Sequence, residues 1–401
     1  SAFVVVVVGG MGSLTGAFVA AIIVSVVKAL CIWLGVVSVL GVELAFPKLT
    51  LVAEFLVMAA VLIWRPWGLF GKPMAPSLYA QPESAWRLPS PLQNGITVAV
   101  LVVAAALPWW SAQAPYAVIL ATDMLIAVLF AASLHLLMGP AGMHSFGHAA
   151  YYGLGAYGAA LMVTSAGLPM PVALVLAPLA ATAGALLFGW FSVRLSGVYL
   201  AMLTLAFAQI VWSVAFQWDA VTGGSNGIIG LWPPDWLSEP QRYYWLVLAC
   251  MALGIWFLRR VLFAPFGYAL RAARDSAIRA QAIGIDVHRV QWMGFVVTGT
   301  VAGLAGALFA FSKGSIAPDV LSVAQSINGL VMVMLGGVQA LAGPVVGASV
   351  FVWLSDTVSQ HSDYWRAALG GIILLLVLLF PRGLAGYGQW LFGRGKGGQL
   401  K

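Results

Sequence analysis

Long apolar runs, separated by short polar stretches, follow one another along almost the whole chain. A helix needs about 20 residues, most of them apolar, to cross the hydrocarbon core of a bilayer. The runs predict membrane spans at residues 14–34, 49–64, 96–110, 115–138, 149–166, 169–193, 197–218, 243–263, 290–311, 326–341, 343–360 and 366–380. Residues 3–8 form a further short run, so we expect the chain to begin inside a membrane segment. The pattern predicts an all-α integral membrane protein, a polytopic helical bundle with about 12 transmembrane spans plus a partial one.

One segment interrupts this pattern with prolines and polar residues. Between Arg65 and Gly95 the chain carries Pro73, Pro76, Pro82, Pro89 and Pro91. Proline at this density disfavours a helix, because it fixes φ and lacks the backbone N–H. We therefore predict a linker over residues 73–95. It separates a short unit, residues 1–72, from a long unit, residues 96–390, and a tail, residues 391–401.

The two units share an internal repeat. Residues 4–21 and 331–348 are identical at eight of eighteen positions, and Gly9-Gly10 corresponds to Gly336-Gly337. Each copy precedes one further span that ends in Pro-x-Gly-Leu, at residues 66–69 and 381–384. The repeat predicts two related units, of which residues 1–72 are the C-terminal part of the first. Membrane transporters are often built from such repeats, with the pathway where the repeats meet.

The composition fits a protein that lies mostly in lipid. Hydrophobic residues make up 62% and charged residues 8% of the 401 positions, and the mean hydropathy is +0.98. Soluble domains carry about a quarter charged residues, so no aqueous catalytic domain is expected. The net charge of +7 comes from residues scattered among short loops, without the dense basic run that would indicate a nucleic-acid partner. Cys31 and Cys250 lie in apolar segments and are expected to be buried thiols rather than a disulfide.

The basic residues also predict the orientation. When the predicted spans are threaded alternately, fourteen Lys and Arg residues fall on one side, and only Lys48, Arg242, Lys313 and Arg366 fall on the other. Cytoplasmic loops carry the excess of Lys and Arg, so the first side is predicted to be cytoplasmic. The linker and the tail then lie in the cytoplasm, and Lys28 is left within a span.

Five blocks, in order along the chain, resemble one known family. They are residues 145–157 (SFGHAAYYGLGAY), 195–209 (LSGVYLAMLTLAFAQ), 222–227 (TGGSNG), 266–280 (FGYALRAARDSAIRA) and 336–344 (GGVQALAGP). These blocks are similar to those of the branched-chain amino acid ABC transporter permease family, whose two membrane subunits are usually separate polypeptides. Residues 96–390 resemble a complete second subunit of the LivM type, and residues 1–72 resemble the last part of a first subunit of the LivH type.

The resemblance implies a function and a set of partners. It implies a multi-pass permease in a bacterial inner (plasma) membrane, which imports branched-chain amino acids or related small polar solutes. The family also includes permeases for urea, short amides and aromatic acids. The implied partners are two cytoplasmic ABC ATPase subunits and a periplasmic solute-binding protein. The chain has no Gly-x4-Gly-Lys-Ser/Thr motif, so the partners are expected to bind ATP, while this chain holds no cofactor and is not an enzyme.

The longest polar loop on the predicted cytoplasmic side, residues 264–289, is a candidate contact for these ATPases. Helical spacing places its charged residues on one face, and residues 280–284 resemble the docking segment of the family, with Gln281 where an acidic residue is often found. The candidate coupling residues are Arg271, Arg274, Asp275, Arg279, Gln281 and Gly284. The alternative is a solvated amphipathic stretch that only follows the charge rule.

Four residues within or directly beside the predicted spans are candidates for the translocation pathway. Asp123 is the ninth residue of its span, where a carboxylate is costly and usually functional, although it could also be a structural, hydrogen-bonded group. Gly336 and Gly337 interrupt an apolar run, as a broken helix at a pathway would, although tight packing would also need them. His148 matches the family histidine and is expected to begin a helix near the cytoplasmic surface.

His144 lies four residues before His148, a spacing that can place two imidazoles on one metal ion, but no third ligand is near in the sequence. No metal site is predicted.

Two other function classes are weighed against the permease. An ion-coupled secondary transporter would need polar groups at mid-membrane, for which Asp123 is the main candidate. A membrane enzyme would need a cluster of Asp or His, for which only the two histidines offer support.

Overall fold

The helices of the computed structural model follow the apolar runs of the sequence. The structure describes residues 2–39, 42–45, 47, 50–72, 91–110, 115–361 and 363–387. The helices are α1 (Ala2–Gly9), α2 (Leu14–Leu34), α3 (Thr50–Trp64), α4 (Pro91–Trp110), α5 (Pro115–Met138), α6 (His148–Thr164), α7 (Met170–Ser192), α8 (Gly197–Gln217), α9 (Asp219–Thr222), α10 (Pro240–Leu262), α11 (Pro265–Asp275), α12 (Ala277–Ala282), α13 (Val287–Lys313), α14 (Val323–Gly336), α15 (Gly343–His361) and α16 (Trp365–Leu379). Two short antiparallel pairs join β1 (Val36–Val39) to β2 (Val42–Ala45) and β3 (Ile228–Ile229) to β4 (Ser315–Ile316).

Seven helices of the described residues are long and apolar enough to cross a membrane, namely α2, α5, α7, α8, α10, α13 and a segment that contains α16. The chain is thus a polytopic, helical membrane protein. The other predicted spans coincide with helices that are shorter or less apolar, such as α3, α4 and α14. The predicted count of about 12 is therefore not confirmed.

Two further expectations concern the segments between the units. Most of the predicted linker and the whole predicted tail, residues 391–401, lie outside the described residues. The prediction that the linker extends to residue 95 is wrong, because α4 already begins at Pro91. Proline is accepted in the first turn of a helix, where its missing N–H would have no helical partner in any case. The two cysteines, Cys31 and Cys250, are free and half-buried.

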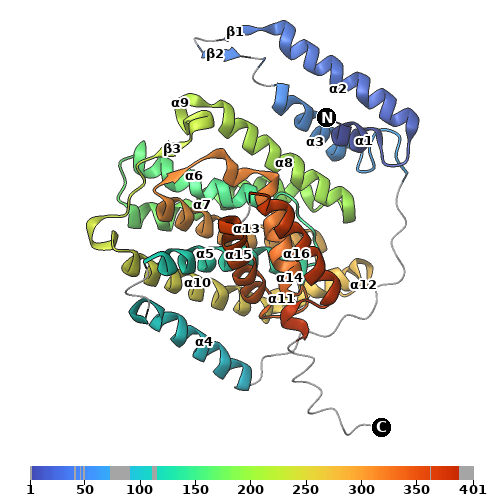
Figure 1. Ribbon diagram of the computed structural model, residues 1–401. Helices are drawn as coiled ribbons and strands as arrows, with labels where there is room; N and C mark the ends of the chain where they lie inside the picture. Colours follow the sequence, from blue (N-terminus) through green and yellow to red (C-terminus); the bar gives the residue numbers. More distant parts are fainter. Residues whose placement is uncertain are drawn as a thin grey trace, which may run out of the picture.

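Helix α13 occupies the centre of the bundle and packs against α5, α6 and α7. Small residues allow these backbones to approach closely. A Cβ atom on Gly155 of α6 would collide with the backbone of Gly303 in α13, and one on Gly306 would collide with the carbonyl of Tyr152. In Figure 1, α5, α6, α7 and α10 cross the view from side to side, and α12 and β3 lie at opposite ends.

We call the end that carries α11 and α12 the inner end, because the charge distribution predicts that it faces the cytoplasm. The outer end carries β3, β4 and Lys313, the last residue of α13. Helices α1–α3 pack against the bundle through α3 and α8, whereas α14 and α15 pack against α5. The blue N-terminal helices therefore lie at the edge of the molecule beside α8 in Figure 1.

The internal repeat is visible as a repeated glycine contact. Gly10 follows α1 with φ +99° and Gly337 follows α14 with φ +106°. The glycine of each Pro-x-Gly-Leu segment also has a positive φ, +79° at Gly68 and +73° at Gly383. A Cβ atom on Gly68 would lie 2.6 Å from the nitrogen of Gly10, and one on Gly383 would collide with Gly337. We call these two contacts, Gly10 with Gly68 and Gly337 with Gly383, the glycine clasps.

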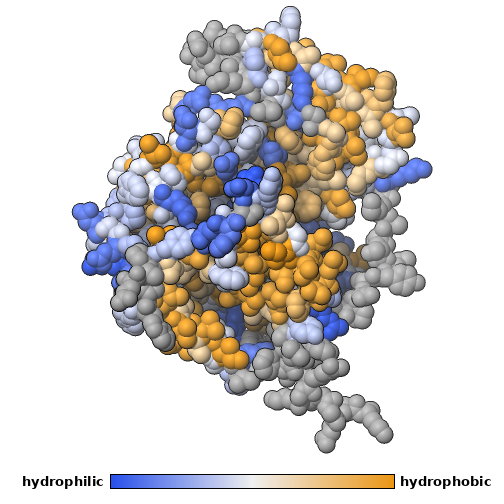
Figure 2. Space-filling view, viewed as in Figure 1, coloured by the Kyte–Doolittle hydropathy of each residue, from blue (hydrophilic) through white to orange (hydrophobic). Residues whose placement is uncertain are grey.

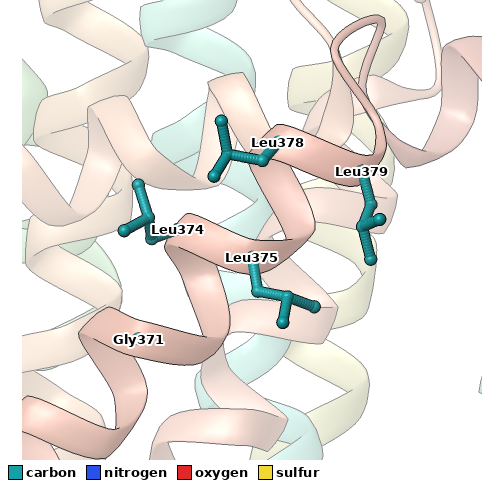
Figure 3. A pocket seen from close by; sticks show the side chains of 5 residues that line it. All are labelled: Gly371, Leu374, Leu375, Leu378 and Leu379. Atoms are coloured by element: carbon teal, nitrogen blue, oxygen red, sulfur yellow. The ribbon is translucent and has the colours of Figure 1, made fainter.

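Large apolar faces remain exposed on the outside of the bundle. On α16 the exposed residues include Leu374, Leu375, Leu378 and Leu379, and much of the surface where Figure 1 shows this helix is apolar in Figure 2. With Gly371 they line a shallow hollow on the outer face of this helix (Figure 3). Such a surface suits lipid chains rather than a polar solute, so the candidate site must lie elsewhere.

Candidate functional site

The loop between α10 and α13 folds into two short helices at the inner end. Pro265 begins α11, and Leu270 and Ala273 of this helix are buried. Ser276 separates α11 from α12, and its side chain accepts a hydrogen bond from the N–H of Arg279. Proline suits the first turn of α11, where its missing N–H would have no helical partner, and the Ser276 cap fixes where α12 begins, because it satisfies an N–H group that has no partner within the helix.

Two of the predicted coupling residues bind the protein itself. Arg271 donates to the carbonyl of Gly267 at 3.2 Å and to the carbonyl of Leu262 at 3.3 Å, and its guanidinium lies 4.2 Å from the ring centroid of Tyr268. Leu262 ends α10, so this cation meets the negative end of a helix dipole. Arg271 therefore fixes the turn from α10 into α11.

Arg274 reaches further, to the residues that join α5 to α6. It donates to the carbonyl of Gly139 at 2.9 Å and pairs with the carboxylate of Asp275 at 2.9 Å. Its alkyl chain fills the space beside Gly142, where an added Cβ atom would collide with it. The solvated alternative considered for this loop therefore does not describe Arg271 and Arg274, which are both half-buried.

The remaining coupling candidates, Arg279, Gln281 and Gly284, are exposed. Beside them are two residues that the sequence reasoning missed, Ile278 and Ile283, with exposed fractions of 81% and 75%. Isoleucine stands out in a loop otherwise rich in charged residues and alanine, and this contrast was the available signal. We call Ile278, Arg279, Gln281, Ile283 and Gly284 the inner surface patch.

Residues 139–147, between α5 and α6, lead from Arg274 into the bundle. We call this segment the strap. At its buried end the N–H of Phe146 donates to the hydroxyl of Thr204 at 3.1 Å, and a Cβ atom on Gly147 would collide with the carbonyl of Thr204. The N–H of Ala149 donates to the hydroxyl of Ser326 at 3.0 Å. Hydroxyl groups from α8 and α14 thus satisfy N–H groups where α6 begins.

His148 begins α6, as expected, and its side chain is fully buried within the protein. Its Nε2 atom lies 2.8 Å from the hydroxyl oxygen of Ser133, whose own proton is donated to the carbonyl of Phe130 at 2.7 Å. This network assigns the ring proton to Nε2 and leaves Nδ1 as a bare acceptor. Neither that Nδ1 nor the hydroxyl of Ser145 has a hydrogen-bond partner among the described residues. His144 is exposed, so the two histidines occupy different surroundings.

Asp123 forms an ion pair toward the outer end. Its Oδ2 atom lies 2.7 Å from Nζ of Lys313, and the two side chains are 27% and 35% exposed. The other carboxylate oxygen, Oδ1, is buried and has no hydrogen-bond partner within the described part of the chain. Sequence reasoning missed this pairing because the partner lies 190 residues away. Neighbouring contacts join α5 to α15, where Tyr116 donates to Asp356 and Gln360 donates to both.

The last two pathway candidates, Gly336 and Gly337, are buried in the second glycine clasp. The residue left within a span, Lys28, pairs with Glu54 of α3 at 2.5 Å. This pair joins α2 to α3 and explains how a lysine is accommodated in an apolar helix, because a charge in lipid needs a partner.

Comparisons with known proteins agree with this architecture. Residues 116–380 match the family described as "Branched-chain amino acid transport system / permease component". The high-affinity branched-chain amino acid transport system permease protein LivM of Escherichia coli K12 is 28% identical over 319 residues, covering 73% of this chain and 75% of the relative. A probable LivM protein of Methanocaldococcus jannaschii is 26% identical and covers 48% of this chain and 61% of its own length.

A second group of relatives is named for the import of another solute. The autoinducer 2 import system permease protein LsrC of Klebsiella pneumoniae is 30% identical over 156 residues, covering 36% of this chain and 44% of the relative. No solved structure matches this chain. The family match covers more than half of the chain, and this protein therefore belongs to the permease components of branched-chain amino acid transport systems, as a multi-pass membrane protein and not an enzyme.

Proposed function

We propose that this chain forms the membrane pathway of an ABC importer for branched-chain amino acids or related small polar solutes in a bacterial inner membrane. Two separate cytoplasmic ATPase subunits would power it, and a periplasmic binding protein would deliver the solute. The observation that carries this proposal is the inner surface patch, where Ile278 and Ile283 are exposed on a polar loop. Exposed apolar side chains within a charged surface are typical of a site that another protein covers.

The energy of covering the patch is large enough to hold a partner. Burying an isoleucine side chain contributes about 1.5–3 kcal/mol, so the pair contributes about 3 kcal/mol or more. A free energy of 1.4 kcal/mol is a tenfold change in affinity, which makes the two side chains worth roughly a hundredfold. Arg279 and Gln281 flank them and would set the orientation of the ATPase.

The test is co-purification of the ATPase subunits with a tagged permease. The variant Ile278→Asp/Ile283→Asp is expected to lose the ATPases while it keeps its thermal stability, because neither side chain packs within the fold. A matched control is Ile229→Asp, which changes an isoleucine that is 77% exposed at the outer end and should leave the complex intact. If the double variant retains the ATPases as well as the control does, the inner surface patch is not the docking site.

The proposed pathway runs from the Asp123–Lys313 pair to the beginning of α6. A zwitterionic solute carries an ammonium group and a carboxylate, which are complementary to the carboxylate of Asp123 and the ammonium of Lys313. The unpartnered Oδ1 atom of Asp123 supports this use, because a buried acceptor without a donor costs free energy. His148 would then offer its Nδ1 atom as a second acceptor deeper in the bundle.

Gly336 and Gly337 would serve the pathway by fixing where α14 ends. Their backbone contacts allow the helix to stop inside the protein, and irregular backbone at membrane depth occurs where it lines a cavity or is enclosed by protein. The same contact in the first clasp supports two related units. Residues 1–72 would correspond to the C-terminal part of a LivH-like unit, and residues 96–390 to a LivM-like unit joined by the linker, with about 12 spans and a partial one in all.

The alternative function is an ion-coupled secondary transporter. The half-exposed Asp123–Lys313 pair favours it in one respect, since membrane carboxylates often bind coupling ions. It would require no ATPase, and the exposed isoleucines at the inner end would then have no role.

A further inference from the structure

Building on the proposed docking of an ATPase at the inner surface patch, we infer that Arg274 is the positioning residue through which a movement of α11 and α12 reaches the buried end of α6, by way of the strap. The inference rests on three consecutive sets of contacts, at the beginning of the strap, at its middle and at its buried end.

The first set joins Arg274 to the beginning of the strap. Its guanidinium is held on one side by the carboxylate of Asp275 and donates on the other to the carbonyl of Gly139. Gly142 has φ +66° and leaves room for the alkyl chain of Arg274. A side chain that is both bonded and enclosed in this way moves together with the segment it touches.

The second set holds the middle of the strap against α11 and α13. One side chain of α11 and one of the strap fill the space in front of Gly294 of α13. A Cβ atom added to it would lie 3.4 Å from Cδ1 of Leu270 in α11 and 3.5 Å from Cε of Met143 in the strap. Leu270 and Met143 are both buried. A shift of α11 therefore displaces the strap, because packed interiors transmit displacement rather than absorb it.

The third set is at the buried end, where polar groups remain uncommitted. The hydroxyl of Ser145 and Nδ1 of His148 are buried without hydrogen-bond partners among the described residues. A buried polar group without a partner costs free energy. A second arrangement of the strap that supplied partners to these groups would recover part of this cost, which favours the strap as the segment that changes its arrangement. Coupling between distant sites requires such an element with two arrangements.

The test follows the accessibility of position 145 in the complete complex. Ser145→Cys is made with Cys31→Ser and Cys250→Ser, and the complex with its ATPases is treated with a small methanethiosulfonate reagent, with and without trapping by ATP and vanadate. The introduced thiol is absent from the native chain, so the parent for comparison is the Ser145→Cys protein. In that parent we expect little labelling without nucleotide and at least a tenfold increase on trapping.

Arg274→Met separates coupling from docking. Methionine keeps the alkyl packing beside Gly142 but loses the bond to the carbonyl of Gly139. We expect the ATPases to co-purify and to hydrolyse ATP as in the parent, while the increase in labelling falls below twofold. Arg289→Met is the control, because it removes the same charge from an arginine that is 81% exposed and makes its ion pair with Asp286. It should keep the full increase.

The result that overturns the inference is an unchanged increase in labelling in Arg274→Met, or an equal loss in both arginine variants. If Ser145→Cys folds poorly, hydrogen–deuterium exchange of residues 139–147 in the chain with native serine replaces the labelling. The same trapping should then raise exchange at the strap, and Arg274→Met should abolish the rise. Failure of the ATPases to co-purify with the parent would instead contradict the proposed function.

Discussion

At the outer end of the bundle, the charges of Asp123 and Lys313 are paired with each other and partly withdrawn from the surface. At the inner end, Arg271 and Arg274 are bonded to backbone carbonyls, whereas Ile278 and Ile283 are exposed. In the proposed function, the outer end would offer both signs of charge to a small solute, and the inner end would offer apolar side chains to a large partner. A transporter that takes its solute from one side and its energy from the other needs this asymmetry.

The largest expected effect comes from breaking the backbone contact that holds the inner ends of α14 and α16 together. Gly383→Ala places a Cβ atom at φ +73° and against Gly337. The left-handed conformation costs roughly 1–2 kcal/mol, and overpacking adds about 1–3 kcal/mol. We expect a clear loss of thermal stability, measured on purified protein in detergent.

Gly370→Ala is the matched control for this substitution. Gly370 lies in α16, the helix that ends shortly before Gly383, and a Cβ atom added to Gly370 meets no atom within 4 Å. Alanine is also the better helix former, so this variant should be as stable as the parent or slightly more stable. Equal stability of the two variants would show that the second clasp is not a tight contact.

The next effect separates structure from transport at the outer end. Asp123→Asn and Lys313→Gln each leave one charge without its partner, and we expect solute uptake to fall by about tenfold to a hundredfold. The double variant removes both charges, so its thermal stability should recover toward that of the parent. Its uptake should remain low if the pair binds the zwitterion. Recovery of both stability and uptake would mean that the pair is only structural.

The smallest effect distinguishes the arginines of the inner end. Arg271→Glu should lower thermal stability, because it replaces the donor to Leu262 with an anion beside a helix C-terminus. Arg279→Glu should change stability little, since the side chain is exposed. It should instead weaken binding of the ATPases most strongly at low ionic strength, where charge pairing across an interface is least screened. The reverse ranking would exchange the roles given to these residues.

Much of the fold follows from local sequence. Apolar runs predict the positions of the helices, since a helix in lipid must satisfy its own backbone. The repeat marks the positions of the glycines that form the two clasps, where only glycine allows such close backbone contact at a positive φ, but the contacts themselves were not predicted. The membership of residues 145–157 in a functional block is also visible in the sequence. The helix positions depend on neighbours within one or two turns of the chain, whereas the clasps join residues that lie far apart in the sequence.

The site depended on contacts that the sequence does not display. His148 bonds to Ser133 of α5, and the N–H of Ala149 at the start of α6 bonds to Ser326 of α14. The sequence also does not show that Arg274 binds within the protein while Arg279 is exposed, because the partner of Arg274, Gly139, lies 135 residues before it. Helical spacing alone placed Arg271, Arg274 and Arg279 on one face, whereas the helix ends at Asp275 and Arg279 belongs to α12.

The central claim is that this chain conducts solute only as part of an ATP-driven complex. The direct test measures uptake of radiolabelled leucine into proteoliposomes. The chain alone, given a proton or sodium gradient, is expected to accumulate no solute and to hydrolyse no ATP. With its ATPase subunits, a binding protein and ATP, the permease assembled with any further membrane subunit should accumulate leucine. Accumulation by the chain alone, driven by an ion gradient, would contradict the account and establish a secondary transporter.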